Sequence, residues 1–207
     1  MSGAAPLRIE GRSGGCAIVN GRDTIMLGLN DYLGLATDPE VIAATKDALS
    51  VHGAGAGIYP VFASTPLHEA LCGELAAFLG TEAVLLYSSG GAANSGVLTT
   101  LAGEGDVILS DRLNHASIID GCRLSRAETV TFANRDAAAL AEALGRTTGR
   151  RRLIVTDGIF SMEGAAAPLK ELHALAMVHD ALLVLDEAHA TGVVGPEGRG
   201  TATLAGI

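Results

Sequence analysis

Short apolar runs alternate with helical patterns along most of the 207-residue chain. Val, Ile and Leu fill these runs without a strict apolar–polar alternation, which is typical of strands covered on both faces. Alternation of such strands with helices predicts βαβ units, an α/β fold class and a mostly parallel sheet. The predicted strands are residues 83–87, 107–109, 129–132, 153–156 and 181–186.

Three helix starts can be predicted from capping signals. Asp38 and Thr65 are each followed by Pro, which suits the first position of a helix because its missing N–H has no helical partner there. Another helix is predicted to begin near Pro168, where the leucines at positions 169, 172 and 175 form an apolar stripe. These helices would connect and cover the strands.

The composition excludes several classes of protein. The formal net charge is −9, whereas a nucleic-acid-binding protein needs a basic face for phosphates. The one basic cluster, residues 150–152, precedes an apolar strand and is interpreted as a solvated turn. The three cysteines lack metal-ligand spacing, and the sequence contains neither an apolar run of membrane length nor a signal-peptide pattern. We therefore expect a cytoplasmic protein that binds neither nucleic acid nor membrane.

Four segments with polar side chains lie at or just after the carboxyl ends of predicted strands. Open α/β sheets bind their ligands at these ends. The four segments are residues 88–94 (SSGGAAN), 111–117 (DRLNHAS), 156–164 (TDGIFSMEG) and 183–192 (LVLDEAHATG). The first could bind phosphate through small residues and the N–H groups of a following helix, or could be a plain glycine-rich turn. In the second, His115 could stack on an aromatic cofactor ring, or Asn114 could simply cap a helix. The third indicates a functional loop without naming a reaction.

The fourth segment places Asp186 at the end of an apolar strand. Opposite a pyridine nitrogen, such a carboxylate keeps the nitrogen protonated, so that the ring draws electrons from a bound substrate. His189, three residues on, could hydrogen-bond a ring hydroxyl. A DEAH-type helicase strand is a rival interpretation, but the phosphate loop that it requires is absent from the sequence. Metal binding by Asp186, Glu187 and His189 is another, although it lacks a further ligand set.

In this order, the motifs resemble the α-oxoamine synthases, which are fold-type I enzymes dependent on pyridoxal 5′-phosphate. Residues 30–35 (NDYLGL) and the helical pattern at 67–76 are similar to further family motifs, so the resemblance runs from Arg8 to the end of the chain. It implies the large domain of these transferases, with residues 1–50 as an N-terminal segment and first helix and residues 51–207 as a partial cofactor-binding domain. The sheet is expected to be incomplete at the C-terminus, and the small C-terminal domain is expected to be absent.

The resemblance also implies roles for individual residues. Gly90 and Gly91 would bind the cofactor phosphate, and Asp186 would pair with the pyridine nitrogen. The remaining roles are stacking on the ring and substrate alignment by His115, contacts near the ring hydroxyl by Ser161 and His189, and substrate binding by Asn30.

The implied activity is condensation of an amino acid with an acyl-CoA, with decarboxylation, by an enzyme that is a homodimer at full length. Residues 188–192 and 167–169 are more like the 8-amino-7-oxononanoate synthases, which make a biotin precursor, than the 2-amino-3-ketobutyrate CoA ligases. Residues 57–63 and Cys72 depart from the family pattern. The family's Schiff-base lysine is expected beyond Ile207, and neither Lys46 nor Lys170 replaces it, so the chain alone is expected to be inactive. A non-catalytic partner subunit remains the alternative.

Overall fold

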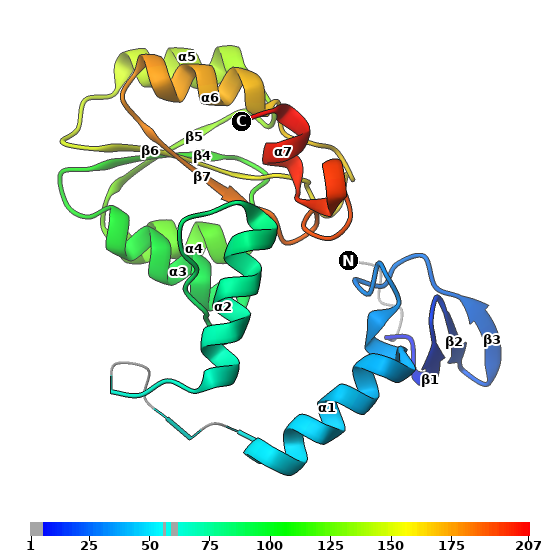
Figure 1. The fold of residues 1–207 in the computed structure, drawn as a ribbon. Coiled ribbons are helices and arrows are strands. Elements are labelled where there is room, and N and C mark those ends of the chain that lie inside the picture. Colours follow the sequence, from blue (N-terminus) through cyan, green and yellow to red (C-terminus); the bar gives the residue numbers. More distant parts are fainter. Residues whose placement is uncertain (1–5, 56, 59–61) are drawn as a thin grey trace. The chain divides into compact units, whose positions relative to one another are not determined.

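The computed structural model describes residues 6–55, 57–58 and 62–207, which form two compact units divided after Leu71. The division falls within one helix, α2 (Pro66–Leu79). Each unit is described separately below (Figure 1). The domain boundary at residue 50 inferred from the sequence stays a prediction.

The first unit begins with a small antiparallel sheet that the sequence analysis did not predict. Its strands pair in chain order, with positive-φ glycines at the turns. They are β1 (Ile9–Ser13), β2 (Cys16–Val19) and β3 (Arg22–Ile25). Each strand is only four or five residues long, and just Ala17 and Val19 are buried among them. Such short, largely exposed strands give a weak periodic signal.

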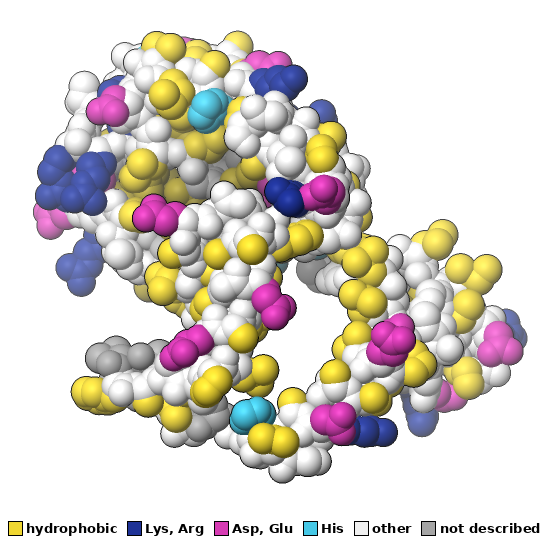
Figure 2. Space-filling view, viewed as in Figure 1, with side chains coloured by type: hydrophobic (Ala, Val, Ile, Leu, Met, Phe, Trp, Pro, Cys, Tyr) yellow, Lys and Arg dark blue, Asp and Glu magenta, His cyan; other side chains and the backbone are white. Residues whose placement is uncertain are grey.

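The two proline-marked helix starts are confirmed. After the short η1 (Leu35–Thr37), α1 spans Pro39–His52, and the Asp38 carboxylate caps it by accepting from the backbone N–H groups of its first turn. At the start of α2, the Thr65 hydroxyl accepts the His68 N–H at 3.3 Å. Neither helix buries a residue, and Figure 2 shows hydrophobic side chains at the surface along both.

The second unit contains the predicted parallel sheet, in the strand order β5-β4-β6-β7. Its helices α3 and α4 cover one face, and α5 and α6 cover the other (Figure 1). The strands are β4 (Val107–Asp111), β5 (Glu128–Phe132), β6 (Arg152–Asp157) and β7 (Leu182–Asp186). The helices are α3 (Gly90–Leu101), α4 (Ala116–Ser125), α5 (Ala137–Arg146), α6 (Leu169–Val178) and α7 (Thr201–Ala205), with the short η2 (Pro196–Gly198) before α7.

The predicted strand at residues 83–87 is wrong. This segment is not a strand in the structure, and no described strand pairs with it. Leu85 is 82% exposed and its neighbours Leu86 and Tyr87 are also exposed. An apolar run predicts only the tendency to be extended, whereas a strand also needs a hydrogen-bonding neighbour.

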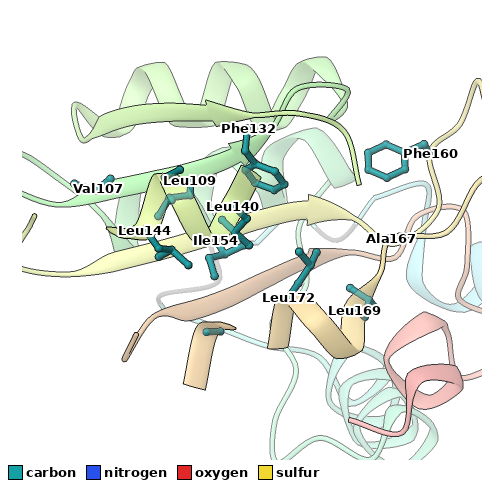
Figure 3. Packing of buried hydrophobic residues seen from close by; sticks show 12 residues of the cluster. Val107, Leu109, Phe132, Leu140, Leu144, Ile154, Phe160, Ala167, Leu169 and Leu172 are labelled. Atoms are coloured by element: carbon teal, nitrogen blue, oxygen red, sulfur yellow. The ribbon is translucent and has the colours of Figure 1, made fainter. Parts of the chain in front are cut away.

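The core lies on both faces of the parallel sheet. Val107, Leu109 and Ile154 belong to one cluster, while Ile108 and Leu153 belong to the other, as expected when successive side chains of a strand point to opposite faces. In Figure 3, the leucines of α5 and α6 lie against the first of these faces. Leu169 and Leu172 are buried there and Leu175 packs beside them, which confirms the predicted stripe. The sheet is therefore fixed from both sides, so its carboxyl edge is a rigid support for a site.

Among the described residues, no helix has the length and apolar character needed to cross a membrane. The three cysteines are free thiols, with Cys122 buried and Cys16 exposed, in agreement with their interpretation as core or surface thiols.

Candidate active site

A small hollow of about 100 Å³ lies at the carboxyl edge of the parallel sheet. Five of the residues predicted from the sequence line it, although they come from three separate segments of the chain. The lining consists of Gly90, Gly91, Asn94, His115, Ser117, Asp157, Asp186, Ala188 and His189.

The glycine-rich segment forms the first turn of α3. Ser89 is the N-cap, and its hydroxyl accepts the backbone N–H of Ala92 at 3.1 Å. The N–H groups in the first turn of a helix have no helical acceptor and point outward with the positive end of the helix dipole. Gly90 has open space where a Cβ would lie, and a Cβ on Gly91 would reach within 3.6 Å of Ser117. This turn can therefore approach an anionic group such as a phosphate closely.

His115 is held at the start of α4. Its backbone N–H donates to Asp157 Oδ2 at 3.1 Å, and its Nδ1 lies 2.8 Å from the Ser117 hydroxyl. The N-cap of this helix is His115 itself, because Nδ1 accepts the backbone N–H of Ser117 at 3.2 Å. The alternative that Asn114 caps the helix is therefore wrong.

Asn114 instead joins the segment after β4 to the end of β6. Its amide donates to the Val155 carbonyl at 2.8 Å and its Oδ1 accepts the Asp157 N–H at 2.9 Å. The side chain is 5% exposed. Asn114 thus fixes the backbone next to His115 relative to the end of β6.

Asp186 ends β7 and faces the hollow with both carboxylate oxygens held. Asn94 Nδ2 donates to Oδ2 at 2.8 Å, and the Ala188 N–H donates to Oδ1 at 2.9 Å. The Asp186 carbonyl accepts the Gly158 N–H at 2.8 Å, which ties the turn after β7 to the turn after β6. The carboxylate is therefore oriented by hydrogen bonds from two different segments.

Asp157 lies beside Asp186 because the two residues are register partners at the ends of β6 and β7. It is 5% exposed. Burial, and then the nearby charge of Asp186, raise the pKa of Asp157 to about 6. Asp157 therefore keeps its proton to a higher pH than an ordinary aspartate does, and the Asp186 carboxylate lies beside it in the lining of the hollow.

Glu187 points away from the hollow. Its carboxylate accepts from the Thr201 N–H, the Thr201 hydroxyl and the Ala202 N–H at 2.8 to 3.1 Å. The described residues contain no group of three His, Cys, Asp or Glu side chains placed to hold a metal ion. The residues proposed as metal ligands, Asp186, Glu187 and His189, therefore do not converge.

Two predicted residues lie outside the lining of the hollow. Ser161 is exposed in a loop that is closed by hydrogen bonds from Phe160 to Ala165 and from Ala167 to Gly158. Asn30 is exposed in the first unit, where its Oδ1 accepts from the Tyr32 hydroxyl at 3.5 Å. Their roles stay predictions. Of the departing segment 57–63, residues 59–61 lie outside the described part of the chain.

Four residues of the lining were not predicted from the sequence: Asn94, Ser117, Asp157 and Ala188. Both Asn94 and Ser117 are inside predicted motifs, with Asn94 one turn into α3 and Ser117 in the first turn of α4. Asp157 ends a strand as Asp186 does, and that parallel was the available signal. Lys170 is in α6 and does not line the hollow, and Lys46 is in α1 of the first unit, as their helical patterns predicted.

Comparison with known proteins gives consistent matches. The aminotransferase class I and II family matches residues 22–206. An 8-amino-7-oxononanoate synthase from Geobacter metallireducens is 48% identical over 202 residues, which are 97% of this chain and 52% of that protein. Another, from Anaeromyxobacter sp. (strain K), is 53% identical over 190 residues, which are 91% of this chain and 48% of that protein.

A solved structure is similar over nearly the whole chain. It is a serine palmitoyltransferase from S. paucimobilis with bound PLP and myriocin, with a TM-score of 0.92 and 39% identity over 97% of this chain and 53% of that chain. These matches confirm the predicted resemblance to the α-oxoamine synthases. The chain spans about half the length of the curated relatives that it matches.

Proposed function

The chain belongs to the aminotransferase class I and II family, and we propose that it is the cofactor-binding part of an 8-amino-7-oxononanoate synthase. Such an enzyme condenses alanine with pimeloyl-CoA, releasing CoA and CO₂. The observation that carries this proposal is the convergence of Gly90, Gly91, His115, Asp186 and His189 on one hollow at the carboxyl edge of the sheet. The names of relatives that are about half identical in sequence support the choice of reaction.

The donors and acceptors around the hollow fit pyridoxal 5′-phosphate. The first turn of α3 offers backbone N–H groups to a phosphate, and Asp186 offers a carboxylate to a pyridinium nitrogen. The imidazole of His115 has a flat face suited to stacking on the pyridine ring. His189 is three residues from Asp186 and lines the same hollow, so both could contact that ring. When bound, the cofactor supplies an electron sink for the α-carbon of the amino acid.

The residues of the chain would then bind and orient. Asp186 would hold a proton on the ring nitrogen, because two N–H donors keep its carboxylate in place. His115 would keep the ring and substrate aligned, since its own backbone is fixed by Asp157. Ser161 and Asn30 would complete the ring-hydroxyl side and the substrate side, as the family resemblance implies.

The lysine that carries the cofactor is proposed to lie in the half of the relatives that this chain does not match. Lys46 and Lys170 are in helices and are not part of the lining. We therefore expect the chain alone to be catalytically inactive. We also propose that the full-length enzyme is a cytoplasmic homodimer.

The test is CoA release by a complete version of the protein, with alanine and pimeloyl-CoA as substrates. Release that stops when pyridoxal phosphate is removed and returns when it is added back is the expected result. Glycine with acetyl-CoA tests the 2-amino-3-ketobutyrate CoA ligase alternative, and serine with palmitoyl-CoA tests the activity named for the structural relative. No CoA release with any pair would contradict the proposal and favour a non-catalytic partner subunit.

A further inference from the structure

The side-chain amide of Asn94 links two residues of the proposed site: Asp186 directly, and His115 through Ser117. Asn94 Nδ2 donates one hydrogen bond to Asp186 Oδ2 at 2.8 Å and another to the Ser117 hydroxyl at 2.9 Å. An amide NH₂ group has two donor protons, so both are in use. The Ser117 hydroxyl in turn lies 2.8 Å from His115 Nδ1.

Counting protons along this chain of bonds gives the direction of each one. The Ser117 hydroxyl accepts from Asn94, and its single proton is therefore available for His115 Nδ1. The backbone N–H of Ser117 points at the same nitrogen, at 3.2 Å. A ring nitrogen that accepts from two donors carries no proton, so the proton of the neutral imidazole is on Nε2.

Close packing of α3 against α4 makes this arrangement rigid. A Cβ on Gly121 of α4 would come within 3.1 Å of the Asn94 carbonyl oxygen and 2.9 Å of Leu98 Cδ1. A glycine at that position lets the two helices approach closely. Asn94 can therefore span the distance to Ser117 with a short side chain.

We propose that Asn94 and Ser117 are positioning residues, which together fix the Asp186 carboxylate and set His115 as its Nε2–H tautomer. The inference deepens the proposed function and rests on it, because it gives these two residues a purpose only where Asp186 and His115 face a cofactor. Asn94 orients Asp186 directly, and it acts on His115 through Ser117. The ring of His115 consequently presents an N–H donor at Nε2 before any ligand arrives.

The tautomer can be measured without cofactor or activity. The 207-residue chain is labelled with nitrogen-15 histidine, and the two ring nitrogens of His115 are assigned with H115Q. At mildly alkaline pH, we expect Nδ1 to have the chemical shift of an unprotonated nitrogen and Nε2 that of a protonated one. A protonated Nδ1 in the unmodified chain would overturn the inference, whatever any variant does.

Two variants test the connection itself. In S117A the hydroxyl donor to Nδ1 is lost, and in N94A the Ser117 hydroxyl is free to accept from a protonated Nδ1. Loss of one hydrogen bond should lower the ratio of Nε2–H to Nδ1–H tautomer by about fivefold in each variant. T99A is the matched control, because the Thr99 hydroxyl bonds only carbonyls of its own helix. Unchanged ratios in both S117A and N94A would also overturn the inference.

Cofactor binding is measured separately, so that the two proposals can fail independently. A complete version that binds pyridoxal phosphate while His115 has a protonated Nδ1 would contradict the positioning role alone. A chain with the expected tautomer, in a complete version that binds no pyridoxal phosphate, would contradict the proposed function and leave the hydrogen-bond assignment standing.

Discussion

Strands β6 and β7 are neighbours in the sheet with similar sequences, yet they differ in burial. Both are apolar and both end in Asp, and their residues pair in register from Leu153 opposite Leu182 onwards. Leu153 is fully buried, whereas Leu182 is 50% exposed. The reason is position: β6 lies between β4 and β7, and β7 is at the edge of the described sheet. Two runs of similar composition can thus have different surroundings.

Asp157 and Asp186, which end these two strands, differ in their surroundings in the same way. Asp157 is enclosed at the end of the inner strand, where it accepts the N–H of His115 and has a raised pKa of about 6. Asp186 ends the edge strand, where Asn94 and Ala188 donate to its two oxygens. Burial favours the protonated form of the Asp157 carboxyl group, and the N–H of His115 opposes this only in part. The comparison therefore assigns a structural role to Asp157 and a ligand-facing role to Asp186.

The largest effect, a loss of stability, is expected from truncating a buried side chain of the inner strand β6. Ile154 and Leu183 are register partners that contribute to the same core cluster, but only Ile154 is fully buried. I154A should lower the free energy of unfolding by about 4 kcal/mol and L183A by about 2 kcal/mol. Urea denaturation of the chain measures both. Equal losses would mean that the edge strand is covered in solution, which sedimentation of the chain would reveal as self-association.

The two aspartates should differ in the reaction. In a complete version, D186N should lower kcat on the order of 100-fold, because the neutral amide cannot stabilise charge on the cofactor ring. D157N should lower kcat less than about fivefold, because an amide oxygen can still accept the His115 N–H. Steady-state rates with alanine and pimeloyl-CoA measure both. A D157N loss as large as that of D186N would contradict the division of roles.

The four strands of the parallel sheet and the glycine-rich turn could be predicted because their signals are local. An apolar run between turns, or glycines before a helix, identifies itself within a few residues. In an open α/β sheet, the segments that follow parallel strands meet at the carboxyl edge, so the sequence alone predicts that His115 and Asp186 lie at the same edge. This is why most of the predicted site residues line one hollow.

The remainder depended on contacts between distant parts of the chain. The run at residues 83–87 is apolar, yet whether it is a strand depends on a neighbour that the run itself does not specify. Asn94 reaches Asp186 across 92 positions of sequence, and no local pattern indicates that pairing. Arg150 lies in an exposed turn, as predicted, and the sequence gives no local sign that its guanidinium also pairs with the buried Asp106, 44 positions away.

The raised pKa of Asp157 predicts a pH dependence of stability. Its ordinary value is 3.8 and the folded value is about 6, so its contribution to stability is fully present below pH 3.8 and is lost as the pH rises through about 6. The full loss over this range should be roughly 3 kcal/mol. D157N should remove this dependence, because an amide does not titrate over this range. The measurement is the difference in free energy of unfolding between wild type and D157N at pH 4 and pH 7.5, and a constant difference would contradict the prediction.

The smallest effect is expected at the opposite end of the sheet, where Asp106 should give a pH dependence of stability opposite in sign to that of Asp157. Asp106 is 1% exposed and accepts both Nε and a terminal nitrogen of Arg150, at 3.0 and 2.9 Å. The hydrogen bonds from Arg150 lower the pKa of Asp106 from 3.8 to about 2. Its contribution to stability is therefore present above pH 3.8 and lost as the pH falls through about 2, the reverse of Asp157.

R150Q should accordingly shift acid unfolding to higher pH, because the Asp106 carboxylate loses its charged partner. R151Q is the matched control for the hydrogen bonds, since Arg151 is exposed, donates to the Leu101 carbonyl at 3.3 Å and acts on Asp106 through its charge alone. Circular dichroism between pH 2 and pH 5 measures the midpoint of each variant. If R150Q and R151Q unfold at the same pH, the Arg150–Asp106 pair makes no net contribution, as is common where one partner remains exposed to water. If only R150Q shifts, Asp106 and Asp157 respond to acid in opposite directions, because hydrogen bonds from a guanidinium favour the charged form of Asp106, whereas burial and then the charge of Asp186 favour the protonated form of Asp157.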